Sequence, residues 1–163
     1  LFSLRTFEVR DWIWAGDPRT MNTIEEPLGH LELDRVVFDG RAHQIKPLKK
    51  NGNTINLTGY LNNGQRLVAL KIKGDSMNRA TPHPIQDGDF VLVVMQDHGR
   101  DGDIVIAGVR GFDQEATIKR LRMRGRWVEL VPETDNPAHE VRRYQKGDAF
   151  VILGVALAVF QPV

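Results

Sequence analysis

The stretch that decides the fold reads Leu67-Val68-Ala69-Leu70-Lys71-Ile72-Lys73-Gly74-Asp75-Ser76-Met77. Residues 67–72 form an apolar run interrupted by a single lysine, which is typical of a β-strand. The run stops at Gly74, and Ser76 follows at the point where the chain is expected to turn. The stretch therefore predicts a strand that carries a serine, a candidate nucleophile, at its end.

The same pattern of short apolar runs and turn residues continues on both sides of this stretch. Turn signals such as Asp39-Gly40, Asn62-Asn63-Gly64 and Asp87-Gly88-Asp89 separate the runs. The expected strands span residues 6–10, 54–58, 67–72, 90–94, 103–107, 115–121, 127–132 and 150–159, with one short strand or two in residues 31–38. No window shows a convincing long amphipathic helix, so we expect a mainly β fold with few short helices.

Composition limits the class of protein. Of the 163 residues, 41% are hydrophobic and 26% are charged, as in ordinary globular domains. A formal net charge of +1 gives no electrostatic reason to expect nucleic acid as the main partner. No apolar run approaches the roughly 20 residues of a membrane helix, so we expect no membrane contact. The absence of cysteine excludes disulfides, thiolate nucleophiles and Cys-based zinc sites, and it agrees with a reducing compartment.

The histidines show no spacing typical of metal ligands, so we expect neither a metal nor a cofactor. We interpret them as scattered surface or loop residues: His30, His43, His83, His98 and His139. The basic run of residues 119–127 could contact phosphates, but its alternation favours solvated faces around a hairpin.

Lys119 is the candidate base for Ser76. A serine hydroxyl becomes a good nucleophile when a base takes its proton, and lysine can serve only if its amine is neutral. Period 2 places Thr117, Lys119 and Leu121 on one face of the expected strand. If that face is the core face, burial lowers the pKa of the Lys119 amine, as a Ser–Lys dyad requires. The alternative is an ordinary exposed lysine on an edge strand.

Gly74-Asp75-Ser76-Met77 resembles the serine motif of the LexA-like self-cleaving serine peptidases, a family that includes LexA, UmuD and phage repressors. Ala116-Thr117-Ile118-Lys119-Arg120-Leu121 resembles the strand that carries the lysine of that family. Further segments resemble the family in the same order along the chain: residues 87–93, 102–107, 128–133 and 154–156. The resemblance implies LexA/UmuD-like twisted antiparallel sheets, with Ser76 as nucleophile and Lys119 as base.

The resemblance also implies a substrate within the chain itself. Family members cut an Ala-Gly or Cys-Gly bond upstream of the serine, and Ala15-Gly16-Asp17-Pro18 resembles the LexA form of that site. We expect Ser76 to attack the carbonyl carbon of Ala15 while Lys119 accepts the proton. The backbone amides of Asp75 and Ser76 would stabilise the oxyanion. The alternative for this segment is that it forms only a turn.

A second Ala-Gly pair, Ala107-Gly108, lies in an expected core strand and offers no extended segment for a peptidase to bind. We expect one structural domain in which residues 67–163 form the peptidase core. Residues 1–18 form an arm with the candidate cleavage site, and residues 19–66 form a β insertion that is atypical of the family. The chain starts at Leu1 rather than at methionine, which is compatible with a fragment of a longer protein.

The resemblance implies an autoproteolytic regulator that cuts itself once, as a stress or SOS-type transcriptional switch. It also implies a cytoplasmic homodimer, a DNA-binding domain upstream of Leu1, and a damage-sensing co-protease such as a RecA filament. One alternative is a non-enzymatic β interaction module that keeps the fold and binds partners through residues 19–66. A weaker alternative is a signal-peptidase-like Ser–Lys enzyme acting in trans, which the missing membrane anchor disfavours.

Overall fold

The computed structural model describes residues 6–10, 29–31, 35–38, 41–48, 63–109, 116–145, 147–148 and 150–162. Every regular element in these ranges is a β-strand, so the prediction of a mainly β fold is confirmed. The described ranges contain no helix, neither a long one nor any of the few short helices expected. They therefore contain no helix that could span a membrane.

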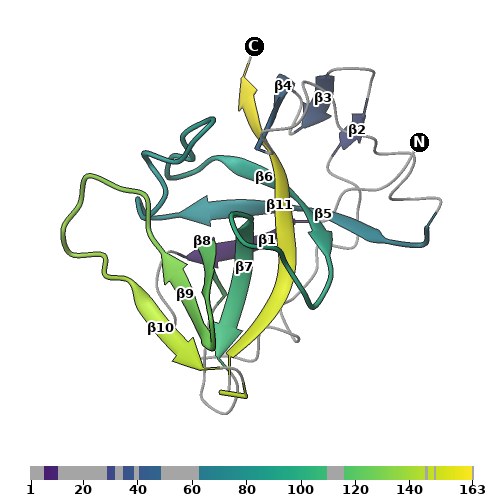
Figure 1. Cartoon of the computed structure of the whole chain (residues 1–163). Helices are drawn as coiled ribbons and strands as arrows, with labels where there is room; N and C mark the ends of the chain where they lie inside the picture. The colour runs from purple at the N-terminus through teal and green to yellow at the C-terminus, as the bar shows by residue number, and fades with distance from the viewer. Residues whose placement is uncertain are drawn as a thin grey trace.

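The strands form one sheet whose members are joined by backbone hydrogen bonds (Figure 1). They are β1 (Thr6–Arg10), β2 (Gly29–Leu31), β3 (Arg35–Phe38), β4 (Arg41–Pro47), β5 (Arg66–Lys73), β6 (Phe90–Met95), β7 (Ile104–Val109), β8 (Thr117–Arg124), β9 (Trp127–Val131), β10 (Arg142–Gln145) and β11 (Phe150–Pro162). The main path runs β1-β5-β6-β11-β7-β8-β9-β10. A branch adds β4 to β11, then β3 and β2.

The long strand β11 organises the sheet. Its 13 residues pair with β6 and with β7, and its last part, Ala158–Pro162, pairs with β4. Figure 1 shows β11 in yellow as a continuous strand that crosses the molecule and ends near β4. The strand expected at residues 150–159 is therefore a single, longer strand with three partners.

The central strands are buried on both faces, which explains why their sequences are continuously apolar rather than alternating. In β6, Val91 and Val93 belong to one hydrophobic cluster, whereas Leu92 and Val94 belong to another on the opposite face. The first cluster also contains Met77 and Ile85, from the loop that follows β5. The loop with the candidate serine is therefore part of the core.

β1 and β5 form a parallel pair, and the direction of β1 matters for the site. It lies beside β5 with Thr6 opposite Ala69 and Arg10 opposite Lys73. Parallel strands end at the same edge of a sheet, so the chain leaves β1 at the edge where β5 leads into Gly74. β1 also contacts β8, the strand that carries Lys119.

Most strands lie within a few residues of their predicted bounds, but some predictions were incomplete. The sequence did not predict β10, whose residues are mostly exposed and have no apolar alternation. The region around residues 31–38 contains β2 and β3, and β4 follows as a further strand. The expected strand at residues 54–58 lies outside the described residues.

Gly154 lies where the pairing of β11 with β7 shifts register. A Cβ atom built on Gly154 would lie 2.5 Å from Val93 Cγ1 and 2.7 Å from the Val94 carbonyl oxygen. The second neighbour is backbone and cannot rotate away, so only glycine lets these strands approach so closely.

We predict that Gly154→Ala lowers the free energy of unfolding by about 1–3 kcal/mol, because it overpacks a buried part of β11. Gly99→Ala is the matched control, since its new Cβ would meet side-chain atoms and no backbone, the nearest being Val105 Cγ1 at 3.1 Å and Leu121 Cδ2 at 3.2 Å. Urea denaturation measures the free energy of unfolding of both variants. The loss of this free energy in Gly99→Ala should be less than half of the loss in Gly154→Ala. An equal loss in the two variants would contradict the close-approach argument.

Candidate active site

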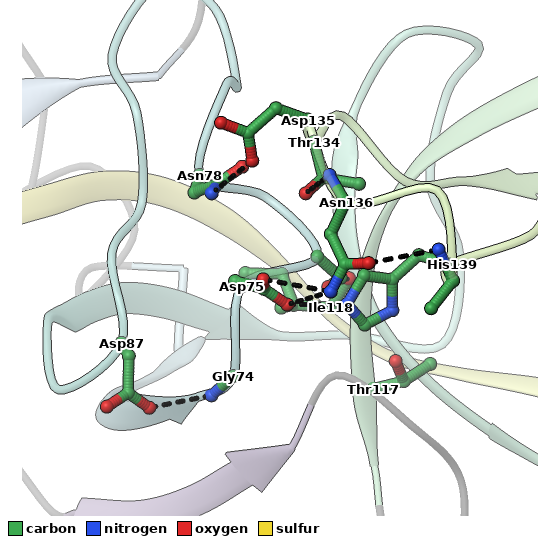
Figure 2. A network of polar contacts seen from close by, with 12 residues as sticks. Gly74, Asp75, Asn78, Asp87, Thr117, Ile118, Thr134, Asp135, Asn136 and His139 are labelled. Atoms are coloured by element: carbon green, nitrogen blue, oxygen red, sulfur yellow. Dashed lines mark hydrogen bonds and ion pairs between the residues drawn. The ribbon is translucent and has the colours of Figure 1, made fainter.

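Ser76 lies in a tight turn directly after β5, which we call the serine turn (residues 74–79). Gly74 has a φ of 97°, a left-handed conformation that favours glycine. Its N–H donates to Asp87 Oδ1 at 2.7 Å (Figure 2). The glycine that ends the apolar run therefore redirects the chain, as the sequence predicts, and the following residues fold back over the sheet.

Apolar burial holds the serine turn against the sheet. Met77 is 1% exposed and Ile85 is fully buried, and the Ile85 N–H donates to the Met77 carbonyl oxygen at 3.0 Å. A fully buried side chain of this size contributes about 1.5–3 kcal/mol. Ser76 therefore lies between two anchored points, Gly74 and Met77.

The structure brings Ser76 and Lys119 into contact. Lys119 Nζ lies 2.9 Å from Ser76 Oγ and 2.7 Å from Thr117 Oγ1. Ser76 Oγ also lies 3.3 Å from the Ile118 carbonyl oxygen, to which its hydroxyl donates in this arrangement. Ser76, Thr117 and Lys119 are each at most 3% exposed. A hydroxyl and an amine, far apart in sequence, thus meet in a dry part of the molecule.

This arrangement suits proton transfer between the two side chains. A protonated lysine donates to Ser76 Oγ, whereas a neutral amine accepts the hydroxyl proton across the same distance. Burial disfavours the charged form of an amine. The contact of Lys119 with Thr117 agrees with the period-2 expectation that both side chains lie on one face of β8.

Arg120, on the opposite side of β8, is also buried, which the expectation of solvated faces for residues 119–127 did not foresee. Only 6% exposed, it forms an ion pair with Glu133 Oε1 at 2.6 Å and donates to the carbonyl oxygens of Gly102 and Thr81. The tip of the hairpin is exposed as expected, with a turn between Arg124 and Trp127. Arg120 therefore ties β8 to the loops on either side.

Glu133 connects this ion pair to the serine turn. Its N–H donates to the Ser76 carbonyl oxygen at 2.9 Å, and its own carbonyl oxygen accepts from the Arg79 N–H at 2.9 Å. Glu133 therefore contacts the strand of the lysine through its side chain and the turn of the serine through its backbone. Sequence reasoning assigned no role to Arg120 or Glu133, because their pairing depends on how distant loops pack.

The loop between β9 and β10 (residues 132–141) also reaches the serine turn (Figure 2). His139 Nε2 lies 2.5 Å from Asp75 Oδ1, and Asn136 Nδ2 donates to Asp75 Oδ2 at 3.1 Å. Asp135 accepts from Asn78 Nδ2 at 3.0 Å and pairs with Arg79 at 3.1 Å. The turn is therefore held by side chains of a loop that follows β9.

The histidine expectation was right in part. His139 lies in a loop, as expected, but its side chain is only 16% exposed and is hydrogen-bonded to Asp75. His43 lies on β4 and is buried at 8% exposure, with its Nδ1 2.9 Å from the Arg41 carbonyl oxygen. Among the described residues no group of His, Asp or Glu could hold a metal ion.

The surroundings of Asp75 and Asp135 lower the pKa of both carboxyl groups. Hydrogen bonds from His139, and then from Asn136, hold the pKa of Asp75 below its ordinary 3.8. Asn78, and then Arg79, lower the pKa of Asp135 in the same way. Since both pKa values are depressed, these contacts are fully present above the ordinary value and are lost as the pH falls through the lower, folded-state values.

The other site residues expected from the sequence have different outcomes. The candidate cleavage pair, Ala15 and Gly16, lies outside the described residues, and its assignment stays a prediction. Asp75 and Ser76, the expected oxyanion donors, lie in the serine turn beside the Lys119 amine. Ala107-Gly108 lies in β7, paired with both β8 and β11, and is unsuited to enter an active site.

We predict that His139→Ala raises the pKa of Asp75 toward its ordinary value, and that Asn136→Ala raises it by a smaller amount. Carboxyl-carbon NMR titration measures both shifts. Asn78→Ala is the control, because it removes a partner of Asp135 and leaves the Asp75 contacts in place. An Asp75 pKa that stays the same in His139→Ala would show that the hydrogen bond does not lower it.

Comparisons with known proteins relate the chain to one family and to several repressors. The family described as Peptidase S24-like matches residues 42–157. A LexA repressor of Thermotoga neapolitana is 36% identical over 149 residues, which cover 91% of this chain and 70% of the relative. A LexA repressor of Oleidesulfovibrio alaskensis is 45% identical over 89 residues, 55% of this chain and 39% of the relative. For a LexA repressor of Cereibacter sphaeroides the identity is 35% over 112 residues, 68% of this chain and 47% of the relative.

The chain thus spans between 39% and 70% of the length of these three relatives. The family match begins at residue 42, inside the segment 19–66 that we expected to be an insertion. β4 lies in that overlap and pairs with β11. The proposed division into arm, insertion and core stays a prediction.

Proposed function

The chain belongs to the Peptidase S24-like family, and we propose that it is a self-cleaving serine endopeptidase. The family match confirms the resemblance to the LexA-like peptidases. In this proposal Ser76 is the nucleophile and Lys119 is the base. The observation that carries the proposal is the buried 2.9 Å contact between Lys119 Nζ and Ser76 Oγ. Its preorganised geometry supports proton transfer without rearrangement of either strand.

The reaction is an acyl transfer in two steps. The neutral Lys119 amine takes the Ser76 hydroxyl proton while Oγ attacks the carbonyl carbon of Ala15. The backbone N–H groups of Asp75 and Ser76 donate to the developing oxyanion. Lys119 then gives the proton to the leaving nitrogen of Gly16, and the Ala15–Gly16 bond breaks. In the second step Lys119 takes a proton from a water whose oxygen attacks the ester carbon on Ser76, and it returns this proton to Ser76 Oγ as the ester bond breaks and the carboxylate of Ala15 is released.

The direction of β1 supports cleavage within one chain. β1 ends at Arg10, which lies opposite Lys73 in the parallel pair, at the edge of the sheet where β5 leads to Ser76. Residues 11–15 connect Arg10 to the candidate cleavage site. An extended chain covers about 3.3–3.6 Å per residue, so these residues reach roughly 17 Å. Neighbouring strands are only about 4.8 Å apart. The arm therefore has ample length to deliver Ala15 to Ser76, whatever path residues 19–66 follow.

The relatives are named as repressors, and this supports a regulatory use of the cleavage. We propose that the cut acts once, as a stress or SOS-type transcriptional switch in the cytoplasm. The homodimer, the DNA-binding domain upstream of Leu1 and the RecA-like co-protease filament stay predictions from the family. A non-enzymatic β interaction module is the second candidate, and the first experiment below separates it from the peptidase.

We predict that purified protein cleaves itself faster as the pH rises, because Lys119 acts only as a neutral amine. Ser76→Ala should abolish the reaction, and Lys119→Ala should lower its rate constant by about 10²–10⁴-fold. Lys71→Ala, which removes an exposed lysine from β5, is the matched control and should cleave normally. A wild-type chain that stays intact at every pH would favour the interaction module.

We further predict that mass spectrometry under denaturing conditions finds fragments 1–15 and 16–163. Denaturation is needed because β1 would remain hydrogen-bonded to β5 after the cut. Ala15→Trp should block cleavage by its bulk, whereas Ala15→Ser, the small-residue control, should retain it.

The first-order rate constant of self-cleavage should not change when the protein is diluted, because the serine and its substrate belong to one chain. A rate that falls in proportion to concentration would indicate cleavage between chains.

A further inference from the structure

We propose that His139 is a positioning residue for self-cleavage, which holds Asp75 and thereby orients the serine turn for attack. The inference rests on the proposed function, and it deepens the description of the same site. The feature that carries it is a side-chain contact between the loop of residues 132–141 and the residue that immediately precedes Ser76.

The contact is part of a preorganised arrangement. Asp75 uses both carboxylate oxygens, one toward His139 and both toward Asn136 Nδ2 (Figure 2). The orientation of the Asn136 amide is fixed from its other side, because its Oδ1 accepts from the Ala138 N–H at 3.0 Å. The Asn136 N–H in turn donates to Thr134 Oγ1 at 3.0 Å. The Asn136 amide that donates to the Asp75 carboxylate is therefore itself held in place.

Asp75 is exposed enough that packing alone does not hold it. Its side chain is 43% exposed, whereas that of His139 is 16% exposed. The side chain of Asp75 belongs to the residue whose N–H is a proposed oxyanion donor. Restricting that side chain restricts the backbone that carries both this donor and the Ser76 nucleophile. A misplacement of about 1 Å can cost on the order of 100-fold in rate, so the restraint matters for catalysis.

The hydrogen bond persists in the pH range that the reaction needs. A neutral imidazole donates through Nε2 when the proton is on that nitrogen, so His139 can hold Asp75 while Lys119 is neutral. The lowered pKa of Asp75 keeps the acceptor ionised throughout that range. Asp135 and Arg79, the nearby charged pair, lie on the same loop and turn and add a surface contact. His139 therefore acts by holding Asp75, and its role needs no proton transfer.

The test compares first-order self-cleavage rates against pH for wild type, His139→Ala, His139→Gln and Asp75→Asn. His139→Ala should lower the alkaline plateau by about 10–100-fold, with the midpoint of the profile unchanged. His139→Gln should recover most of the rate, because its side-chain amide also donates. The double variant, His139→Ala with Asp75→Asn, should cleave only slightly more slowly than either single variant, as expected for two residues that form one contact.

Stability and a control variant separate positioning from unfolding. Thermal melts of the same variants on a Ser76→Ala background, where no cleavage occurs, should show folded chains. Arg143→Ala, which removes an exposed ion pair with Glu129, should keep the wild-type rate. His139→Gln keeps a side chain of similar length that can also donate, so it tests the contact even if His139→Ala is unstable.

Several results would overturn the proposal. An unchanged plateau in His139→Ala would remove the positioning role. A plateau that is kept while the midpoint of the pH profile shifts would mean that His139 acts on the base and not through Asp75. Wild-type protein that never cleaves would overturn the proposed function and this inference together, whereas cleaving wild type with normal His139 variants overturns this inference alone.

Discussion

The structure depends on the burial of a lysine amine beside a serine hydroxyl. An isolated ammonium is costly to bury, so a buried Lys119 is tolerable only with polar partners or in its neutral form. Ser76 and Thr117 supply partners at 2.9 and 2.7 Å. The dry surroundings come from strands that are apolar on both faces, as in β6 and β7.

The serine turn is held from three directions, and this explains how a turn can carry precise chemistry. Asp87 accepts from the Gly74 N–H, and Glu133 bonds to the Ser76 carbonyl oxygen. His139 and Asn136 hold Asp75. Arg120 adds rigidity indirectly, because it fixes the Glu133 side chain from the strand that carries Lys119. Loops become precise when their polar groups are satisfied by elements that are themselves packed.

The parallel pairing of β1 with β5 places the end of β1, at Arg10, beside the end of the strand that leads to Ser76. We expected residues 19–66 to be an insertion atypical of the family, which lengthens the chain between Gly16 and Ser76. The described part of the arm bears on this expectation, because β1 ends at Arg10 opposite Lys73, at the edge where β5 leads to Ser76. The family relationship and this topology favour the same reaction, cleavage of the chain by its own serine.

The sequence by itself determined the strand pattern, the serine after β5 and the lysine in β8, because period 2 and turn residues are local signals. It also indicated the family, through motifs kept in order. It could not predict β10, whose mostly exposed residues lack alternation, or the contacts of Arg120, Glu133, Asn136 and His139. Those contacts join residues far apart in the chain, and only packing of the loops against the sheet decides which polar groups meet. Local pattern and the family motifs therefore indicated the proposed pair, Ser76 and Lys119, while the tertiary structure decided what buries and aligns these two side chains.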